Sequence, residues 1–187
     1  MRICVYGAAS NTIDEFYIKE GEKLGRLLAL HGHGLVYGAG ATGLMGAVSR
    51  GVEGENGDVI GVVPEFFTNE EVLNLNCTTL IRTKTMRERK QIMEDYADAF
   101  IITPGGIGTF EEFFEILTLK QLNRHDKPIV ILNTRGYYDP MIKMLEHSIS
   151  EGFLKARCRV MYPVFDTPEQ VLEYVENYKS TELKGMK

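Results

Sequence analysis

The 187-residue sequence lacks an excess of basic residues, and this absence excludes one large class of proteins. Lysine and arginine total 21 against 26 aspartate and glutamate residues, which gives a formal net charge of −5. A general nucleic-acid surface needs a basic excess to displace counterions from phosphates. We therefore expect no nucleic-acid partner.

The sequence also lacks long apolar runs and a regular cysteine pattern. No apolar run approaches the roughly 18 residues that a membrane-spanning helix needs, so we expect no membrane partner. Because a strand pattern begins at Ile3, we expect no signal peptide. Cys4, Cys77 and Cys158 are far apart and odd in number, which favours reduced core thiols over a disulfide framework or a zinc site. These features predict a cytoplasmic protein.

Repeats, linkers and low-complexity segments are absent as well, and short apolar runs alternate with longer helical patterns. Strands are expected at 3–6, 35–37, 59–63, 79–82, 99–102, 129–132 and 160–164, and helices at 14–31, 43–54, 84–96, 109–123, 140–151 and 168–178. This rhythm predicts an α/β fold, a doubly wound, Rossmann-like parallel sheet of about seven strands with helices on both faces. We expect a single nucleotide-binding domain at 1–178 and a polar tail at 179–187.

Glycine-rich turns follow three of the predicted strands, at 7–10, 38–46 and 104–108. Because the carboxyl ends of parallel strands share one edge of a sheet, these turns are expected to converge on one cleft. Gly38, Gly40 and Gly43 also match the spacing of a dinucleotide-binding fingerprint. That fingerprint normally follows the first strand, so the context disfavours a nicotinamide or flavin role. Tight packing of strand against helix is a further explanation of Gly43.

The turn after the fifth predicted strand has the features of a phosphate site. Gly105, Gly106 and Gly108 allow the backbone to turn and approach a ligand, and a helix is expected to begin at Thr109. The first amides of a helix lack internal partners and carry roughly half a positive charge, which attracts phosphate. Glu112 is an unexpected acid one turn into this site. It is either the second half of a capping box with Thr109 or a functional group, and spacing alone leaves both open.

Basic residues concentrate around Arg89 in an otherwise acidic chain. Helical geometry places Arg89 and Lys90 on the same inward face as Met86, with Arg87 on the opposite side. An unpaired buried charge is costly, so the inward cations need a partner. We favour a carboxylate or phosphate in the cleft over a structural ion pair. Glu65, just past the third predicted strand, belongs to the same edge of the sheet.

These motifs resemble the paired signature of the Lonely Guy family, the cytokinin riboside 5′-monophosphate phosphoribohydrolases, whose members are often labelled lysine decarboxylases. The signature is Met86-Arg-Glu-Arg-Lys90 followed by Pro104-Gly-Gly-Ile-Gly-Thr-Phe-Glu-Glu112, and further matching segments cover nearly the whole chain. Two features depart from the family pattern. Arg87 replaces a common histidine, and Gly7-Ala-Ala-Ser10 replaces the more usual Cys-Gly-Ser-Ser, which removes a serine hydroxyl at Ala9. No convincing lysine site for pyridoxal phosphate supports the decarboxylase label.

The resemblance implies hydrolysis of the N-glycosidic bond of a purine nucleoside 5′-monophosphate, an N6-modified adenosine nucleotide, to the free base and ribose 5-phosphate. It implies that Arg89 and Glu112 are catalytic, that Glu65 is a supporting acid, and that no metal or organic cofactor is required. The substrate-binding residues carried over by position are Ser10, Gly40, Gly43, Met86, Lys90, Gly105, Gly106, Ile107, Gly108 and Thr109. A homodimer is also implied. A general adenosine monophosphate nucleosidase and a non-catalytic nucleotide-binding or carrier module on the same fold stay open as alternatives.

Overall fold

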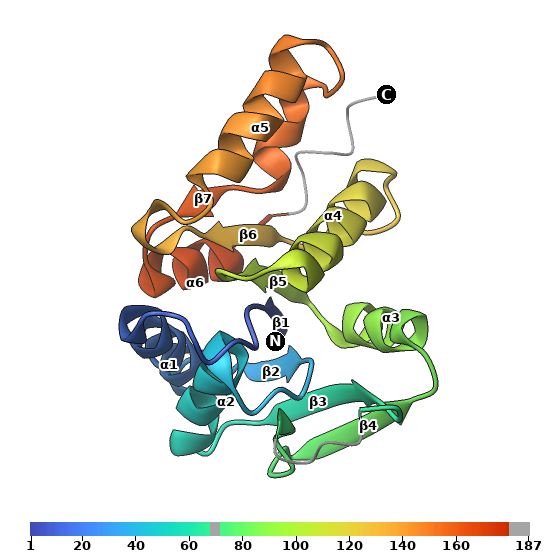
Figure 1. Cartoon of the computed structure of the whole chain (residues 1–187). Helices are drawn as coiled ribbons and strands as arrows, with labels where there is room; N and C mark the ends of the chain where they lie inside the picture. The colour runs from blue at the N-terminus through green and yellow to red at the C-terminus, as the bar shows by residue number, and fades with distance from the viewer. Residues whose placement is uncertain (68–71, 180–187) are drawn as a thin grey trace.

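The computed structural model describes residues 1–67 and 72–179, which form one parallel sheet of seven strands (Figure 1). The strands are β1 Arg2–Tyr6, β2 Gly34–Tyr37, β3 Val59–Pro64, β4 Thr79–Thr83, β5 Ala99–Ile102, β6 Ile129–Leu132 and β7 Val164–Phe165. Their order across the sheet is β4-β3-β2-β1-β5-β6-β7. The predicted doubly wound α/β fold is confirmed.

Helices connect the strands, and several begin at a capping side chain. They are α1 Glu15–Leu30, α2 Gly43–Gly54, α3 Met86–Tyr96, α4 Ile107–Gln121, α5 Asp139–Ser150 and α6 Pro168–Asn177, with short 3-10 helices η2 Thr134–Gly136 and η3 Ala156–Met161. Asp14 begins α1 by accepting a hydrogen bond from the Phe16 amide at 2.8 Å. Thr85 begins α3 in the same way, with the Glu88 amide at 3.1 Å from its hydroxyl oxygen. This cap fixes the start of the helix that carries Arg89.

Alternate residues of the strands face two separate hydrophobic cores. In β1, Ile3 and Val5 pack into the core that includes residues of α1, α2 and α6, while Cys4 and Tyr6 pack into the core that includes residues of α3, α4 and α5. Figure 1 shows α1, α2 and α6 on one side of the sheet and α3 and α4 on the other. Both faces are covered, as expected for a parallel sheet whose central strands are apolar and buried.

The predicted strand at 160–164 was wrong except at its last residue. Residues up to Met161 form η3, and β7 consists of two residues that continue the sheet beside β6, with Val164 opposite Ile131. Val160 is 52% exposed, so its apolar side chain marks no buried strand. Of the predicted polar tail at 179–187, residues 180–187 lie outside the described residues.

The order of the strands reverses between β1 and β5. From β1 the chain proceeds outward to β2, β3 and β4, and from β5 it proceeds in the opposite direction to β6 and β7. The turns that follow β1 and β5 therefore run in opposite directions from the carboxyl ends of these two strands. Their divergence creates the crevice where this class of sheet binds ligands.

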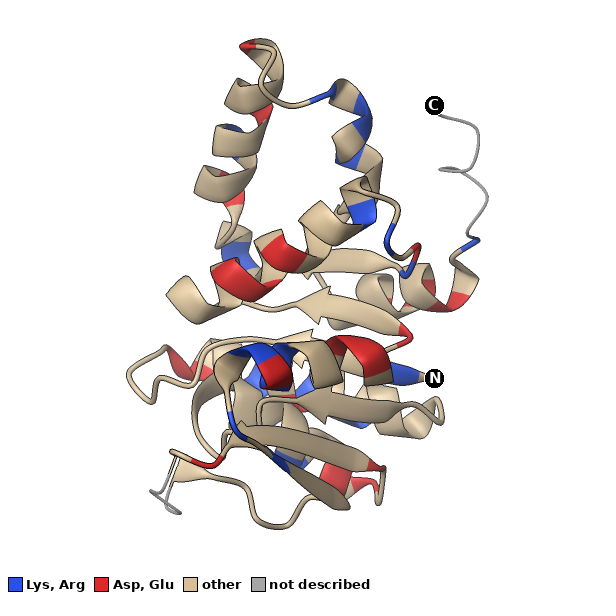
Figure 2. Ribbon diagram, turned by 90° about the vertical axis from the view of Figure 1, so that its right-hand side faces the viewer, with Lys and Arg blue, Asp and Glu red and all other residues tan. Residues whose placement is uncertain are grey.

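Charges of both signs are interspersed over the helices and turns (Figure 2). Neither sign covers a whole face in this view. Among the helices of residues 1–67 and 72–179, none combines the length and the apolar character needed to cross a membrane.

Candidate functional site

A cleft of about 580 Å³ opens where the strand order reverses. The turn at 7–10 after β1, Gly38 and Gly40 after β2, and residues of the turn and helix start at 106–109 after β5 all line it. The predicted convergence of three glycine-rich turns on one cleft is confirmed.

The start of α4 forms one end of this cleft. The helix begins at Ile107, two residues earlier than predicted, because Gly106 adopts the extended N-cap conformation, and no side chain caps it. A Cβ built on Gly106 or Gly108 would meet no atom within 4 Å, so the backbone is open at both positions. The first amides of the helix are thus accessible to an anion from the cleft.

The capping-box interpretation of Thr109 and Glu112 is wrong, because Thr109 is the third residue of α4 and not its N-cap. Thr109 is only 4% exposed, and its hydroxyl oxygen lies 2.1 Å from the position that a Cβ on Gly105 would occupy. Gly105 is therefore required for close packing beneath the turn and does not line the cleft.

Arg89 and Glu112 form a buried ion pair in the cleft. The Nη1 of Arg89 donates to Oε1 of Glu112 at 2.9 Å, and the two side chains are 10% and 11% exposed. The Nε of Arg89 donates to the carbonyl of Val62, at 3.1 Å. Arg89 therefore has a carboxylate partner in the cleft, and because that partner is Glu112, the contact is an ion pair within the protein. Both ends of the guanidinium are held, and Arg89 in turn fixes the orientation of the carboxylate.

Burial raises the pKa of the Glu112 carboxyl, and the attraction of Arg89 offsets only part of that rise. The pKa of Glu112 therefore lies above its ordinary value of 4.5. A raised pKa brings a carboxyl group closer to the range in which it exchanges protons with a substrate or water.

Gly38 belongs to the site for a reason that the sequence did not reveal. A Cβ built there would lie 2.0 Å from Nη2 of Arg89, so the guanidinium occupies the space that any other residue would fill. The only sign of this contact in the sequence was the glycine itself. Its spacing from Gly40 and Gly43 matched a dinucleotide-binding fingerprint instead. The neighbour of Gly38 is Arg89 of α3, which lies 51 positions later in the chain (89 − 38).

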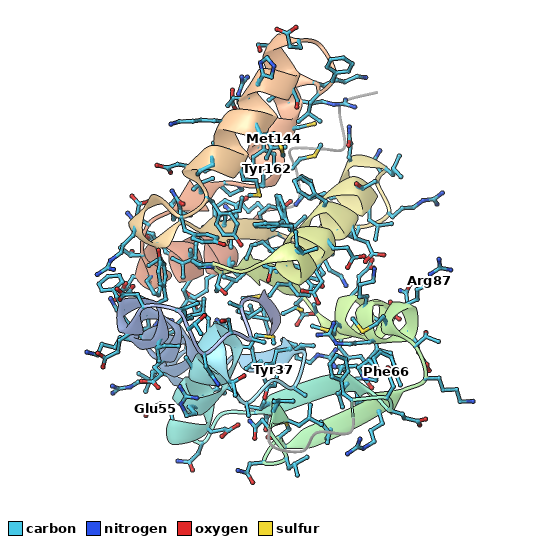
Figure 3. All side chains as sticks on the ribbon, in the orientation of Figure 1. Tyr37, Glu55, Phe66, Arg87, Met144 and Tyr162 are labelled. Carbon is cyan, nitrogen blue, oxygen red and sulfur yellow. The ribbon has the colours of Figure 1, made fainter. Side chains whose placement is uncertain are left out.

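Lys90 lies outside the lining of the cleft, unlike Arg89. Its ammonium group pairs with Glu111 and, at 2.8 Å, with Glu115, both on α4. Both inward-facing cations are therefore paired with carboxylates of α4, Arg89 with Glu112 and Lys90 with Glu111 and Glu115. Arg87 points away from the body of the protein (Figure 3), as the helical geometry predicted.

The other predicted substrate-binding residues divide into two groups. Ser10, Gly40 and Met86 line the cleft together with Gly106, Gly108 and Thr109. Ile107 is 82% exposed and does not line it. Gly43 lies behind the wall with a φ of +61°, and a Cβ there would come within 2.6 Å of the Ser10 carbonyl oxygen. Tight packing therefore explains Gly43, although its contacts are with the turn at 8–10 and not with a strand, and Gly43 supports that turn from outside the cleft.

Glu65 is not brought together with Arg89 and Glu112. It follows β3, is exposed, and is absent from the lining of the cleft. Its backbone amide donates to the Thr83 carbonyl at 2.8 Å, which fixes the turn and leaves the carboxylate outside the site.

An apolar wall of the cleft was missed entirely by sequence analysis. It is formed by Met45, Val63, Pro64, Phe67, Val72 and Leu73. Val72 and Leu73 reach the cleft because their segment pairs with the turn after β2. The Ala41 amide donates to the Val72 carbonyl at 2.9 Å, and the Asn74 amide donates to the Ala39 carbonyl at 2.8 Å. No local pattern in the sequence indicates this pairing.

Among the residues that the structure describes, no group of three or more His, Cys, Asp or Glu side chains is arranged to hold a metal ion.

Residues 45–175 match the protein family described as "Possible lysine decarboxylase". The chain is 38% identical to a cytokinin riboside 5′-monophosphate phosphoribohydrolase of Oryza sativa subsp. japonica over 95% of this chain and 73% of the relative. It is 35% identical to a protein of the same name from Arabidopsis thaliana, over 95% of this chain and 83% of the relative.

Solved structures share the fold. The structural genomics target TM1055 is 25% identical, with a TM-score of 0.74 that covers 95% of this chain and 99% of that one. The molybdenum cofactor carrier protein of Chlamydomonas reinhardtii is 23% identical, with a TM-score of 0.69 over 94% of both chains. At that identity the second likeness concerns the fold alone.

Proposed function

The chain belongs to the Lonely Guy family of cytokinin riboside 5′-monophosphate phosphoribohydrolases, and from this membership we propose that it hydrolyses the N-glycosidic bond of an N6-modified adenosine 5′-monophosphate. The products would be the free base and ribose 5-phosphate. The observation that carries the proposal is the buried pair of Arg89 and Glu112, which lines the same cleft as the uncapped start of α4.

The phosphate would bind at the start of α4. The amides of residues 106–109 and the Thr109 hydroxyl supply hydrogen-bond donors, and the positive end of the helix dipole favours a dianion. The apolar wall, with Val63 and Leu73 among its members, would contact the base and its N6 substituent. In this arrangement the sugar would lie beside the ion pair of Arg89 and Glu112.

Glu112 would act at the sugar. Cleavage of the bond between the base and the anomeric carbon builds positive charge on the ribose, which a nearby carboxylate stabilises. The oxygen of a water molecule bonds to the anomeric carbon as a hydroxyl group. The other proton of that water is transferred to the ring nitrogen of the base, which leaves as the neutral free base. Arg89 holds Glu112 in place and favours its ionised form against the cost of burial. Glu65 is exposed and outside the cleft, so this mechanism gives it no step.

A lysine-dependent decarboxylation has less support from the site. Among the described residues that line the cleft, none is a lysine. Lys90, one turn into α3, is engaged with Glu111 and Glu115. A Schiff base with pyridoxal phosphate would need a lysine amine that reaches the cofactor.

The family resemblance also leads us to propose a homodimer that works in the cytoplasm. Phe67 and Met86 line the cleft and are nevertheless 43% and 40% exposed, which leaves apolar surface at its mouth for a second subunit to cover. Cys4, Cys77 and Cys158 are free thiols, as in reducing compartments. Light scattering of the purified protein tests the assembly.

The decisive experiment is to incubate the purified protein with plain and N6-prenylated adenosine monophosphate and to measure the free base by chromatography. Release from the prenylated nucleotide with a higher kcat/KM supports the proposal. Equal rates on both nucleotides would indicate a general nucleosidase. Binding of nucleotide without any release of base would indicate a carrier module and would overturn the proposed chemistry.

A further inference from the structure

Four consecutive carbonyl oxygens of the turn at 103–106 accept hydrogen bonds, three from segments elsewhere in the protein and one, at Gly106, from the first turn of α4. The donors are the Tyr138 hydroxyl to Thr103 at 2.7 Å, the Ala8 amide to Pro104 at 3.0 Å, the Tyr137 hydroxyl to Gly105 at 2.7 Å and the Phe110 amide to Gly106 at 3.0 Å. Two of the four are side-chain hydroxyls from adjacent residues. The negative ends of these peptide groups are therefore engaged by the protein.

The bond to Gly105 has a direct consequence for the neighbouring amide. In a trans peptide the C=O and N–H groups point in opposite directions, and the described residues contain no cis peptide. Holding the Gly105 carbonyl towards Tyr137 therefore turns the Gly106 amide away from Tyr137. Gly106 lies between the main cleft and a neighbouring pocket of about 230 Å³ and lines both, whereas Tyr137 lines the neighbouring pocket and not the main cleft.

Tyr138 performs a different task from its neighbour. Its hydroxyl binds the carbonyl of Thr103, and the next residue, Pro104, has no amide hydrogen to orient. Tyr138 therefore fixes the end of β5, from which the turn departs. The ring is 1% exposed and lies edge-on to Phe110 of α4, so this anchor is inside the core.

The tyrosines are themselves held firmly after β6. The Tyr138 amide donates to Oδ1 of Asn133 at 2.7 Å, and Nδ2 of Asn133 donates to Asp139 at 2.8 Å. The Tyr137 ring lies edge-on to Tyr17 of α1, with ring centroids 6.2 Å apart.

The direction of the amides matters because the cleft has little other positive charge. Among its described lining residues the only Lys or Arg is Arg89, whose guanidinium is already engaged by Glu112 and the Val62 carbonyl. A phosphate at the start of α4 would depend on backbone amides and the helix dipole for most of its binding.

We propose that Tyr137 and Tyr138 are positioning residues for the phosphate subsite: Tyr137 sets the direction of the Gly106 amide, and Tyr138 fixes the strand end that carries the turn. The inference rests on the proposed function, because it assigns the phosphate of the nucleotide to this turn. Neither tyrosine lines the main cleft, so both act through the backbone.

The test is the variant Tyr137→Phe, assayed with the nucleotide and with the matching nucleoside that lacks the 5′-phosphate. We expect the KM for the nucleotide to rise by about three- to tenfold with little change in kcat, as for the loss of one oriented hydrogen bond. The inhibition constant of ribose 5-phosphate should rise by the same factor, and that of adenine should stay constant. An unchanged KM, or equal losses with nucleotide and nucleoside, would overturn the inference.

Tyr162→Phe is the matched control, because the buried Tyr162 hydroxyl has no hydrogen-bond partner in the part of the chain that the structure describes. It should leave all constants unchanged. Tyr138→Phe should impair nucleotide binding at least as much as Tyr137→Phe, since its bond is buried. If Tyr138→Phe does not fold, the exposed position of Tyr137, at 39%, keeps the inference testable.

Calorimetric titration with ribose 5-phosphate separates this inference from the proposed function. Wild-type protein that releases no base from any nucleotide contradicts the proposed function. Weaker binding of ribose 5-phosphate by Tyr137→Phe than by wild type would still support the positioning role, and equal binding would refute it.

Discussion

The guanidinium of Arg89 occupies the space that a side chain at Gly38 would need, with Nη2 only 2.0 Å from the position of a Cβ. This contact joins the turn after β2 to α3 and positions the partner of Glu112. A small change at Gly38 should therefore act on the chemistry of the site without acting strongly on the fold.

Gly38→Ala should lower kcat by about ten- to a hundredfold, because displacement of the guanidinium disturbs Glu112. The atom in the way is the end of a flexible side chain, so the free energy of unfolding should fall by no more than about 1 kcal/mol. Steady-state kinetics and urea denaturation measure the two effects. Gly54→Ala is the control, since a Cβ there meets no atom within 4 Å. Wild-type kinetics in Gly38→Ala would show that the guanidinium position is unimportant.

Glu112→Gln should abolish effective release of the base, with kcat lowered by about a hundredfold or more, while nucleotide binding largely persists. The amide keeps the shape of the side chain but removes the negative charge that stabilises the ribose. Chromatography measures the released base, and calorimetry measures binding. Glu115→Gln, on the same helix and outside the cleft lining, should retain activity. A fully active Glu112→Gln variant would remove Glu112 from the mechanism.

The pH profile of kcat/KM should have an acidic limb with a midpoint above 4.5, because burial raises the pKa of Glu112 and the proposed mechanism uses its ionised form. Activity is therefore lost as the pH falls through that pKa. Stability responds in the opposite direction. A carboxyl whose pKa is higher in the folded chain than in the unfolded chain favours folding at low pH and loses that contribution as the pH rises. A midpoint at or below 4.5 would contradict the assignment.

Gly108→Ala should raise the KM for the nucleotide and leave the fold intact. A Cβ there meets no atom within 4 Å, but the residue lines the cleft beside the proposed phosphate site. Alanine also favours helix over glycine by up to about 1 kcal/mol, so the melting temperature should stay constant or rise. Kinetics and thermal denaturation of the same sample provide the measurement. Unchanged KM would place the phosphate elsewhere.

Lys90→Met should leave the KM for the nucleotide within about twofold of wild type, because Lys90 bonds to Glu111 and Glu115 and lies outside the cleft lining. Lys23→Met, which breaks the exposed pair with Glu169, is a control for the loss of a surface ion pair. A tenfold rise in KM specific to Lys90→Met would restore Lys90 as a nucleotide ligand.

Periodicity predicted the sheet and the inward face of α3 because both depend on residues close together in the sequence. Arg89 was placed correctly from its angle on the helix alone. Element ends were less predictable. Gly106 took the extended N-cap position and advanced the start of α4, and the apolar stretch near Val160 ended a 3-10 helix in which Val160 itself is exposed.

The remaining parts of the site depend on contacts between distant segments. Glu65 has the same residue type as Glu112 and follows a strand at the same edge of the sheet, yet the path of its turn leaves it exposed. Tyr137 and Tyr138 reach the phosphate turn only because β6 lies next to β5. Such proximity follows from the order of the strands, which no local pattern specifies.

The segment carrying Val72 and Leu73 joins the cleft through main-chain hydrogen bonds to Ala39 and Ala41, whereas Arg89 and Glu112 come from α3 and α4. Main-chain bonds do not depend on which side chains are present. Mutations at Val72 and Leu73 can therefore accumulate in a lineage without loss of the ion pair. Descendants of one ancestral enzyme can thus diverge in the base they accept while they inherit the same bond-breaking chemistry.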